Sequence, residues 1–450
     1  MNYDEAVRYL LSLGRELAAP TQAAAAKFNL ENITILLERL GRPDRAYPCV
    51  HIAGTNGKGS TAAFVEAILR DAGFRTGLNT SPHLERINER IRINGEEVSD
   101  EVFADTFTRI HGLIEELLAE GKLKAHPTYF ECVTAMAFEV FARERVEFGV
   151  IEVGLGGRLD ATNVITPAVS VITRIDFDHE NFLGHSLREI AGEKLGIVKH
   201  GVPVVSAPQV AEVKELVRAR AKELFAPLME TDEVFFVERE RIEGGCARAA
   251  VKVMETGEEM QIATQLPGRF QLQNALNAVA AARVLQERGF RITSENIERG
   301  IAAAVWPGRL EKLQERPEVY LDGAHNPGAA RELAKFLEEN FTSRRVYLLY
   351  GAMRDKSIDE VSGILFPHAT EVIFTQPRTP RAVSAAQLAE VAGHHAAKFS
   401  IIQDAERALE ETLAKSRPED AIFVTGSLYL VGQLRQAWKQ RQVALAEKRP

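Results

Sequence analysis

The fold is decided by the stretch Val50-His51-Ile52-Ala53-Gly54-Thr55-Asn56-Gly57-Lys58-Gly59-Ser60-Thr61, which joins a short apolar strand to a helix through a glycine-rich turn. Glycines in such a turn let backbone N–H groups curl around phosphate oxygens, and the helix N-terminus adds a positive partial charge. A lysine in the turn adds a full charge, and a hydroxyl at the start of the helix can hold Mg²⁺. The residues of this predicted triphosphate cradle are Gly54, Gly57, Lys58, Gly59 and, beside the metal, Ser60 or Thr61.

The turn departs from the general phosphate-loop pattern, because Ile52 stands at the first glycine position and Gly59 separates Lys58 from Ser60. An ordinary turn with an incidental lysine is the alternative. The context favours the cradle, since the strand and a helix expected from Ser60 to Leu69 lie where phosphate binding requires them.

Length and composition are those of an ordinary globular chain with more than one domain. Its 450 residues are too many for one hydrophobic core and suggest two or three domains. Apolar residues at 45% and charged residues at 26% are typical of a globular enzyme. The net charge of −8 argues against a broad surface for nucleic acid or anionic membrane, so an anionic substrate must meet a local basic cluster.

The three cysteines, Cys49, Cys132 and Cys246, have no paired or CxxC spacing, which predicts neither a disulfide framework nor a zinc site built on them. The first five residues are acidic overall and lead into helix-spaced apolar residues, and no apolar run approaches the length of a bilayer span. We expect a cytoplasmic protein that is neither secreted nor inserted in a membrane.

Helical and strand signals alternate along most of the chain, which is typical of βαβ units around a buried parallel sheet. Helices are expected at residues 60–71, 101–120 and 129–144, and apolar strands at 148–153 and 168–175. Between about Pro203 and Gln265, short charged and β-rich pieces such as 233–237 and 249–254 predict a β-rich annex to the first domain. A long alanine-rich helix, Gln273–Glu287, is expected to pack back on that domain.

A second α/β series begins after a boundary expected near residues 302–304. Its predicted elements are strand Val319–Leu321, helix Gly328–Glu339, strand Val346–Tyr350, strand Glu371–Thr375, helix Ala405–Ala414, strand Ala421–Thr425 and helix Leu428–Gln440. We therefore predict an α/β protein: a phosphate-loop ATPase domain on a parallel sheet, residues 1–302, and a smaller doubly wound α/β domain, residues 303–450. The active site is expected in the cleft between the domains.

Two acidic motifs follow consecutive strands of the first predicted sheet. Glu152 ends one strand and precedes a glycine loop, residues 154–160, and Asp176-Phe177-Asp178-His179 ends the next strand. Ligands gather beyond the carboxyl ends of parallel strands, so these acids suit Mg²⁺ or substrate. A solvent-exposed acid that caps a turn is the alternative for Glu152, and an Asp helix cap with an incidental histidine is the alternative for the second motif.

The helix expected at Leu187–Lys199 carries Glu193 and Lys194 one turn before its end. A buried lysine beside a metal–phosphate centre can lose its proton and react with CO₂. On local grounds alone, a solvated Glu193–Lys194 face is the favoured interpretation.

Polar groups of the second domain are also expected to face the cleft. Asp322-Gly323-Ala324-His325-Asn326-Pro327 lies between an apolar strand and a helix, although its residues equally suit a plain turn. Arg309 lies on the hinge, where domain closure would bring its fixed charge to triphosphate oxygens. Gln273 and Asn274 open the alanine-rich helix, where their amides either read a purine edge or cap the helix.

Nine motifs run in order along nearly the whole chain: Gly54–Ser60, Thr80–His83, Tyr129–Glu131, Glu152–Asn163, Asp178–His179, Gly192–Lys199, Trp306–Arg309, Asp322–Pro327 and Gly426–Tyr429. This series resembles the signature of the folylpolyglutamate synthases, which in bacteria are often bifunctional as dihydrofolate synthases. The series is far more specific than any single member. The resemblance implies an ATP-dependent amide ligase of the Mur ligase superfamily, with an N-terminal ATPase domain and a smaller C-terminal α/β domain.

The resemblance also implies roles for single residues. It places ATP on Asn56, Gly57, Lys58, Gly59, Ser60, Asn274, Arg309 and Asp322. It implies the Mg²⁺ ligands Ser81, Glu152 and His179, a carbamylated Lys194 that holds a second Mg²⁺, and His325 beside the reacting phosphate. Pterin-side contacts are implied for Tyr129, Phe130, Glu131, Leu159, Asp160 and Ala161. The chain departs from the family at Lys27-Phe28-Asn29-Leu30, where Asp-Leu-Gly-Leu is common, which leaves the N-terminal pterin contacts open.

The favoured function is an ATP-dependent ligase that adds L-glutamate to the carboxylate of a folate through an acyl phosphate. Lys58, Arg309 and Mg²⁺ are expected to neutralise the transferring phosphoryl group. We expect a monomer. Whether dihydropteroate is also a substrate, and how long the polyglutamate product becomes, stay open.

Two other functions stay open at this stage. A phosphate-loop NTPase that couples hydrolysis to conformational change is disfavoured, because such a switch needs no second domain with its own polar cleft motif. A ligase acting on a peptidoglycan precursor is the nearer alternative within the superfamily. Those ligases usually carry a nucleotide-sugar-binding domain before the phosphate loop, and here about 50 residues precede the loop, too few for such a domain.

Overall fold

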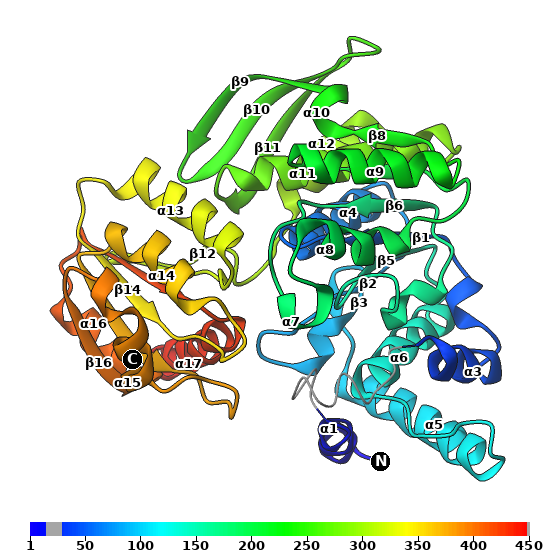
Figure 1. Ribbon diagram of the computed structural model, residues 1–450, viewed down its shortest axis with the longest axis horizontal. Coiled ribbons are helices and arrows are strands. Elements are labelled where there is room, and N and C mark those ends of the chain that lie inside the picture. The colour runs from blue at the N-terminus through cyan, green and yellow to red at the C-terminus, as the bar shows by residue number, and fades with distance from the viewer. Residues whose placement is uncertain (15–28, 448–450) are drawn as a thin grey trace.

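The computed structural model describes residues 1–14 and 29–447, which contain all the predicted site residues (Figure 1). Of the departure at residues 27–30, Lys27 and Phe28 lie outside the described residues. Within the described ranges the chain forms two large sheets covered by helices and one small antiparallel sheet. None of the described helices is long and apolar enough to cross a bilayer.

The larger sheet has the strand order β4-β3-β2-β5-β1-β6-β7-β8. Its strands are β1 (Cys49–Ala53), β2 (Thr76–Asn79), β3 (Ile91–Ile93), β4 (Glu96–Glu97), β5 (Phe148–Glu152), β6 (Val169–Ile172), β7 (Val204–Ser206) and β8 (Leu228–Glu230). β3 joins β2 and β4 in antiparallel pairs, and the other pairs are parallel. The central β1 is buried along its whole length, His51 included, as its mostly apolar sequence predicts.

Helices cover both faces of this sheet because its strand residues alternate between two cores. Val50 and Ile52 of β1 face a core shared with α4 (Lys58–Asp71), α11 (Phe270–Glu287) and α12 (Ser294–Ala303). The opposite face packs against α1 (Tyr3–Ser12), α3 (Glu31–Arg39), α5 (Asp100–Ala119), α6 (Tyr129–Arg143), α8 (Leu187–Lys194) and α9 (Ala211–Glu223). A short helix, α7 (Glu180–Leu183), follows β6.

The region predicted as a β-rich annex, residues 203–265, is only partly one. β7, α9 and β8 continue the parallel sheet, and residues 233–234, where a strand was expected to begin, belong to the short helix α10 (Thr231–Val234). The separate antiparallel sheet consists of β9 (Phe235–Glu243), β10 (Cys246–Val253) and β11 (Glu259–Pro267). It lies over α11 and α12 at the top of Figure 1.

The second half has the strand order β12-β13-β17-β14-β15-β16, with only β12 antiparallel to its neighbour. Its strands are β12 (Glu311–Glu315), β13 (Glu318–Leu321), β14 (Val346–Tyr350), β15 (Glu371–Gln376), β16 (Phe399–Asp404) and β17 (Ala421–Thr425). One face packs on α13 (Pro327–Phe341), α14 (Ile358–Leu365) and α15 (Ala385–Ala392), the other on α16 (Ala405–Lys415) and α17 (Leu428–Glu447). The predicted doubly wound α/β fold is confirmed, and the limits 1–302 and 303–450 stay a prediction.

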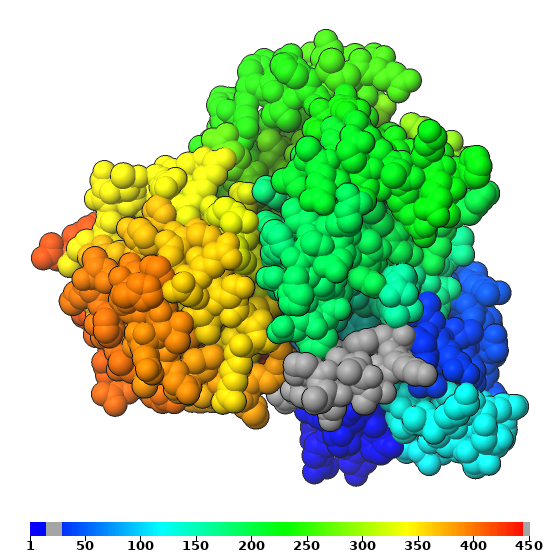
Figure 2. Space-filling model, in the orientation of Figure 1, coloured from blue at the N-terminus to red at the C-terminus, as the bar shows by residue number. Residues whose placement is uncertain are grey.

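The two halves meet along a broad seam (Figure 2). Part of this contact is an approach of α17 to the loop after β2: a Cβ on Gly432 would lie 2.0 Å from the carbonyl oxygen of Leu84. Beside it, Arg435 of α17 pairs with Glu85 and with Glu311. The seam therefore joins polar and tightly packed surfaces of both halves.

Candidate active site

The predicted phosphate loop lies between β1 and α4, and its path requires glycine. Gly54 and Gly57 have φ values of +149° and +87°. A Cβ on Gly54 would lie 1.9 Å from Thr173 Oγ1, and one on Gly57 would lie 2.2 Å from Asn274 Oδ1. These close approaches let only glycine hold the backbone in this curl.

Lys58 begins α4, and its side chain folds back over the loop. Its Nζ donates to the carbonyl oxygens of Gly54 and Thr55, each at 3.2 Å. Burial lowers the pKa of Lys58, while the carboxylates of Glu152 and Asp178 act in the opposite direction. The amine is therefore held at the loop by backbone oxygens and nearby negative charge, in the position predicted for it.

Glu152 stands beside this loop because β5 is the neighbour of β1 in the sheet. The parallel register pairs Ile52 with Glu152, so both strands end at the same edge. Glu152 is 5% exposed, accepts a hydrogen bond from the Ser81 N–H at 3.1 Å, and has a pKa raised by burial. The solvent-exposed alternative for Glu152 is therefore wrong.

Lys194 is also inside the site, contrary to the interpretation as a solvated helix face. It is 4% exposed, and its Nζ donates to Gly54 O at 2.8 Å. Burial, followed by the charge of Lys58, lowers the pKa of Lys194 to about 7. At neutral pH a large share of this amine is therefore uncharged.

The helix predicted to reach Lys199 ends at Lys194 and continues as a 3₁₀ turn, Leu195–Ile197. The glycine loop after β5 packs against this end: the Arg158 N–H donates to Glu193 O at 2.8 Å. A Cβ on Gly196 would lie 2.4 Å from the Arg158 Cα. This contact with the loop lies at the point where the α-helix changes to a 3₁₀ turn, directly after Lys194.

The motif after β13 lies at the carboxyl edge of the second sheet. Asp322 is buried and accepts from the N–H groups of Leu310 and Ala324, at 3.0 and 2.9 Å. Burial raises the pKa of Asp322, and the nearby charge of Arg309 acts against that rise. The motif is thus a turn that also brings buried polar groups to the cleft.

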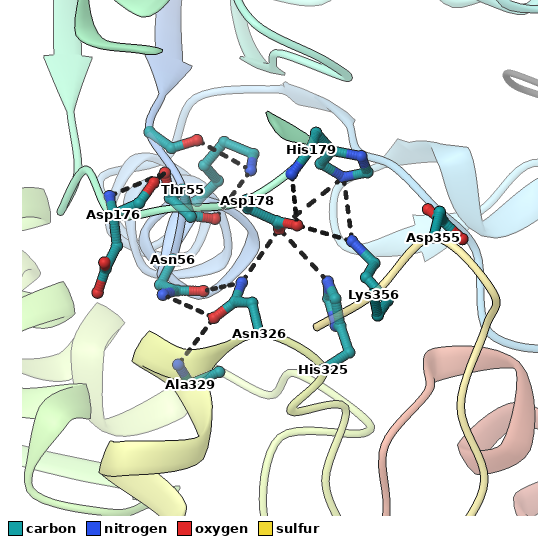
Figure 3. Close-up of polar contacts among 12 residues, drawn as sticks. Thr55, Asn56, Asp176, Asp178, His179, His325, Asn326, Ala329, Asp355 and Lys356 are labelled. Carbon is teal, nitrogen blue, oxygen red and sulfur yellow. Dashed lines mark hydrogen bonds and ion pairs between the residues drawn. The ribbon is translucent and has the colours of Figure 1, made fainter. Parts of the chain in front are cut away.

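Asp178 is the centre of a polar network that joins the two halves (Figure 3). From the second half, Lys356 Nζ donates to its Oδ1 at 2.7 Å, Asn326 Nδ2 donates to its Oδ2 at 3.1 Å, and His325 Nε2 lies 3.6 Å away. Burial alone would raise the pKa of Asp178, but His325 and Lys356 hold it well below the ordinary value. A carboxylate in this setting stays charged.

Asn56 and His179 connect to this network through Asn326 and Lys356, and Asp176 contacts a different residue of the second half. Asn56 of the phosphate loop and Asn326 exchange side-chain hydrogen bonds of 3.3 and 3.0 Å. Asp176 accepts from Arg331 at 3.0 Å. His179, whose pKa is lowered to about 3 by burial, precedes α7 without a side-chain cap, so the helix-cap alternative for this motif is wrong.

A cavity of about 160 Å³ lies between the two carboxyl edges. The predicted site residues that line it are Asn56, Gly57, Lys58, Gly59, Ser60, Ser81, Glu152, His179, Lys194, Asn274, Arg309, Asp322 and His325. A larger open hollow of about 620 Å³, near Arg378 and Arg407, contains none of the predicted residues. The predicted site residues therefore gather at the smaller cavity.

The residues predicted on the pterin side are outside the lining of that cavity: Tyr129, Phe130, Glu131, Leu159, Asp160 and Ala161. Some have local partners. Glu131 forms a capping box with Thr128 at the start of α6, and Asp160 accepts from the Leu155 and Thr162 N–H groups. Their contact with a substrate stays a prediction.

Two details of the sequence interpretation change. Gln273 and Asn274 do not open their helix, because α11 begins at Phe270 and they lie in its second turn. Gln273 donates to Thr231 Oγ1, away from the loop, whereas Asn274 abuts Gly57.

Lys356, which pairs with Asp178 across the two halves, was not predicted from the sequence. The available signal was its position in the loop after β14, at the same strand edge as the motif 322–327.

Comparison with known proteins shows the family to which this chain belongs. Residues 52–282 match the Mur ligase middle domain, and residues 308–428 match the glutamate ligase domain of Mur ligases. The chain belongs to the Mur ligase family. It is 36% identical over 406 residues to the dihydrofolate synthase/folylpolyglutamate synthase of Bacillus subtilis, covering 90% of this chain and 93% of that protein.

Solved structures of this family have the same fold as this chain. Mycobacterium tuberculosis folylpolyglutamate synthase complexed with ADP has a TM-score of 0.86 and 32% identity, covering 97% of this chain and 98% of that one. Escherichia coli FolC in complex with DHPP and ADP has a TM-score of 0.84 and 28% identity, with the same coverage of both chains. Within the Mur ligases the chain is thus a member of the folylpolyglutamate and dihydrofolate synthase family. This membership sets aside the NTPase switch and the peptidoglycan ligase.

Proposed function

We infer that the cavity between the two halves binds ATP and joins L-glutamate to the carboxylate of a folate, the reaction of the ligase family to which this chain belongs. The observation that carries this inference is the meeting of two strand edges in one cavity: Lys58 of the phosphate loop from one half, and Arg309 from the other. A ligase needs this arrangement, because nucleotide and acceptor must react out of contact with water.

In the first step, an oxygen of the folate carboxylate attacks the γ-phosphorus of ATP, the bond to the β-phosphate oxygen breaks, and ADP leaves. In the second step, the amine of glutamate attacks the acyl carbon and phosphate leaves, with loss of the amine proton. Lys58 and Arg309 offer positive charge to the phosphoryl group during transfer. His325, on the acceptor side in this proposal, is oriented by a 2.7 Å contact between its Nδ1 and Gly323 O.

The donor set suits a divalent metal beside the phosphates. Glu152 is a buried carboxylate whose pKa burial raises, so a cation relieves the cost of its charge, and Ser81 adds a hydroxyl oxygen. His179 contributes a neutral nitrogen, since its pKa of about 3 keeps the imidazole uncharged. When bound, Mg²⁺ would screen the charge of the phosphates.

We propose that Lys194 is carbamylated and so becomes an anionic ligand for a second Mg²⁺. Support comes from its buried amine, from the pKa of about 7, and from its place at the cavity wall. An amine that is partly neutral at pH 7 can attack CO₂, whereas an ordinary lysine is almost fully protonated.

The acceptor substrate is the next part of the proposal. We propose that both a folate and dihydropteroate are acceptors, with pterin-side contacts from Tyr129–Glu131 and Leu159–Ala161. The Bacillus subtilis relative is named for both activities, and the Escherichia coli structure contains DHPP. We further propose a monomer that works in the cytoplasm, where ATP is available; the free cysteines Cys49, Cys132 and Cys246 suit a reducing compartment.

One assay tests the proposed function. ADP release is measured with ATP and Mg²⁺ present in six conditions: with and without L-glutamate, each with tetrahydrofolate, with dihydropteroate or with no acceptor. We expect full turnover only when acceptor and glutamate are both present. ATP hydrolysis at the same rate without either one would contradict the ligase assignment, and turnover with one acceptor alone would restrict it to that substrate.

A further inference from the structure

We propose that His111, Glu115 and His126 form a binding site for a Zn²⁺ ion on the first half of the molecule, apart from the cavity between the two halves. His111 and Glu115 lie on α5, and His126 lies in the segment that leads from α5 to α6. One ligand atom from each residue lies within 4.8 Å of the other two. In Figure 1 these elements form the lower part of the molecule, next to α1.

The spacing along the helix is the first reason for this site. Residues four apart face the same side of a helix, so the imidazole of His111 and the carboxylate of Glu115 point to one place, with His111 Nδ1 and Glu115 Oε1 3.9 Å apart. His126 enters from the neighbouring segment. The three donors therefore come from two parts of the chain and surround a point that neither provides alone.

The second reason is that one ring nitrogen of His126, Nε2, is left unprotonated and so can bind a metal ion. Its Nδ1 lies 2.7 Å from the carbonyl oxygen of Pro127, which only a protonated Nδ1 can hydrogen-bond. The other nitrogen, Nε2, then carries the lone pair and is the atom available to bind a metal ion. A histidine held in this way by a backbone carbonyl is the usual arrangement of a metal ligand.

The third reason is an unpartnered atom. His111 Nδ1 is buried and makes no hydrogen bond to any described residue, although buried polar atoms are normally satisfied. The ring itself is fixed between aromatic neighbours: its centroid lies 4.5 Å from that of Tyr9 and 6.0 Å from that of Phe107.

Two nitrogens and one carboxylate oxygen are a donor set that Zn²⁺ takes with a fourth position left for water. Zinc bonds of about 2.0–2.2 Å require the three donors to move closer by about 1 Å, to which the half-exposed Glu115 side chain and the two imidazoles must all contribute. The Tyr9 hydroxyl lies 3.4 Å from His126 Nε2 and donates to it while no ion is bound. The bound ion would fasten α5 to the residues immediately before α6, whose first turn holds Tyr129.

The test uses the full chain with Zn²⁺ alone as the ligand, and excess Mg²⁺ present to occupy the ATP-side metal site. All proteins carry His394→Ala and His395→Ala, because these residues with Asp359 form a second, exposed group of donors that could bind the same ion. Zinc affinity is measured by competition with a chromophoric chelator. Replacing Zn²⁺ by Co²⁺ reports geometry, since a four-coordinate site absorbs visible light far more strongly than a six-coordinate one.

We expect one equivalent of Zn²⁺ to bind and to raise the midpoint of thermal unfolding. His111→Gln or His126→Gln should weaken binding by more than about 100-fold, because loss of a direct ligand exceeds the 10–100-fold typical of an outer partner. Glu115→Gln, at a side chain that is 57% exposed, keeps the fold and should weaken binding by more than about tenfold.

The proposal is overturned if the parent protein binds no Zn²⁺ at micromolar concentration, or if the Gln variants bind it as tightly as the parent. A six-coordinate Co²⁺ spectrum that is identical in parent and variants overturns it as well. Far-UV circular dichroism of each variant shows that the comparison is made between folded proteins.

Discussion

Lys356 reaches from the second half of the molecule to Asp178 in the first, with 2.7 Å between Nζ and Oδ1, and each side chain is 10% exposed. The pair thus joins the two carboxyl edges in a place that water barely reaches. Removing Lys356 leaves the buried charge of Asp178 with only Asn326 and His325 as partners in the second half, which is costlier than loss of a surface pair. The relative position of the two halves therefore depends on this contact.

Lys356→Met should weaken the joined arrangement of the halves. The loss of a buried partner costs about 3–5 kcal/mol, of which part is recovered when Asp178 becomes hydrated, so we expect ligase turnover to fall by about 10–100-fold. Thermal unfolding of each half should change little. Small-angle scattering with ATP bound, compared with the parent, would show whether the halves separate.

Lys439→Met is the matched control, because Lys439 also pairs across the seam, with Glu85 at 2.9 Å, but is 54% exposed. An exposed pair contributes at most about 1 kcal/mol, and Glu85 keeps Arg435 as a partner. We expect near-parental turnover. Equal losses in both variants would show that burial of the Asp178 pair has no special role.

Lys58→Ala should abolish ligase turnover and leave the fold intact. The curl of the loop depends on Gly54 and Gly57, whereas Lys58 contributes charge toward the phosphates. Turnover and the circular dichroism melting curve are measured on the same preparation. Parental turnover in this variant would contradict the phosphate-cradle interpretation.

Glu152→Gln should raise the Mg²⁺ concentration needed for half-maximal turnover, because the amide loses the charge that attracts the ion. Burial raises the folded-state pKa of Glu152, so its ionised form destabilises the metal-free fold once the pH exceeds the ordinary value for a free glutamate. The variant should therefore melt no lower than the parent at pH 7 without metal. An unchanged Mg²⁺ dependence would remove Glu152 from the metal site.

His179→Ala is a separate test of the same site. The imidazole is neutral and meets Lys356 Nζ at 3.4 Å, so its removal leaves the charges of the network in place. We expect a higher Mg²⁺ requirement with a small change in melting temperature. A large loss of thermal stability at parental Mg²⁺ dependence would mean that His179 serves packing instead.

The local parts of this structure were predictable because their causes are local. The strand, the glycine turn and the helix around Lys58 follow from periodicity and from backbone conformations that glycine alone adopts easily. The burial of β1 follows from its apolar residues on both sides of His51. The gathering of Glu152 and Asp178 at one edge follows from the rule that parallel strands end together.

The predictions that were wrong or missing concern features that depend on contacts with distant parts of the chain. The helix expected to continue to Lys199 ends at Lys194 against the loop at Arg158, a contact with residues some forty positions earlier. Lys356 lies among ordinary loop residues, and only the meeting of the halves gives it Asp178 as a partner. Periodicity, which reports one segment at a time, contains no information on either contact.

Carbamylation of Lys194 should depend on pH in the range where its amine loses the proton. With a pKa of about 7, the neutral fraction rises from about one tenth at pH 6 to about nine tenths at pH 8. The neutral amine attacks CO₂ and releases one proton, so carbamate should increase with pH at constant dissolved CO₂. Carbon-13 NMR with labelled bicarbonate measures this. Absence of a carbamate signal at pH 8 would contradict the modification.

Substitution of Lys194 separates an anionic role from a cationic one. If the side chain carries a carbamate toward Mg²⁺, Lys194→Arg should lose turnover although it preserves positive charge and length. Lys194→Ala should lose it too, but a small carboxylate such as acetate can fill the space and restore part of the metal binding, because the missing group is an anion on a stem. The comparison is turnover against acetate concentration, with chloride at equal ionic strength as the control. An active Arg variant, with the parental mass at Lys194 showing no added CO₂, would leave this buried amine as a structural donor to Gly54.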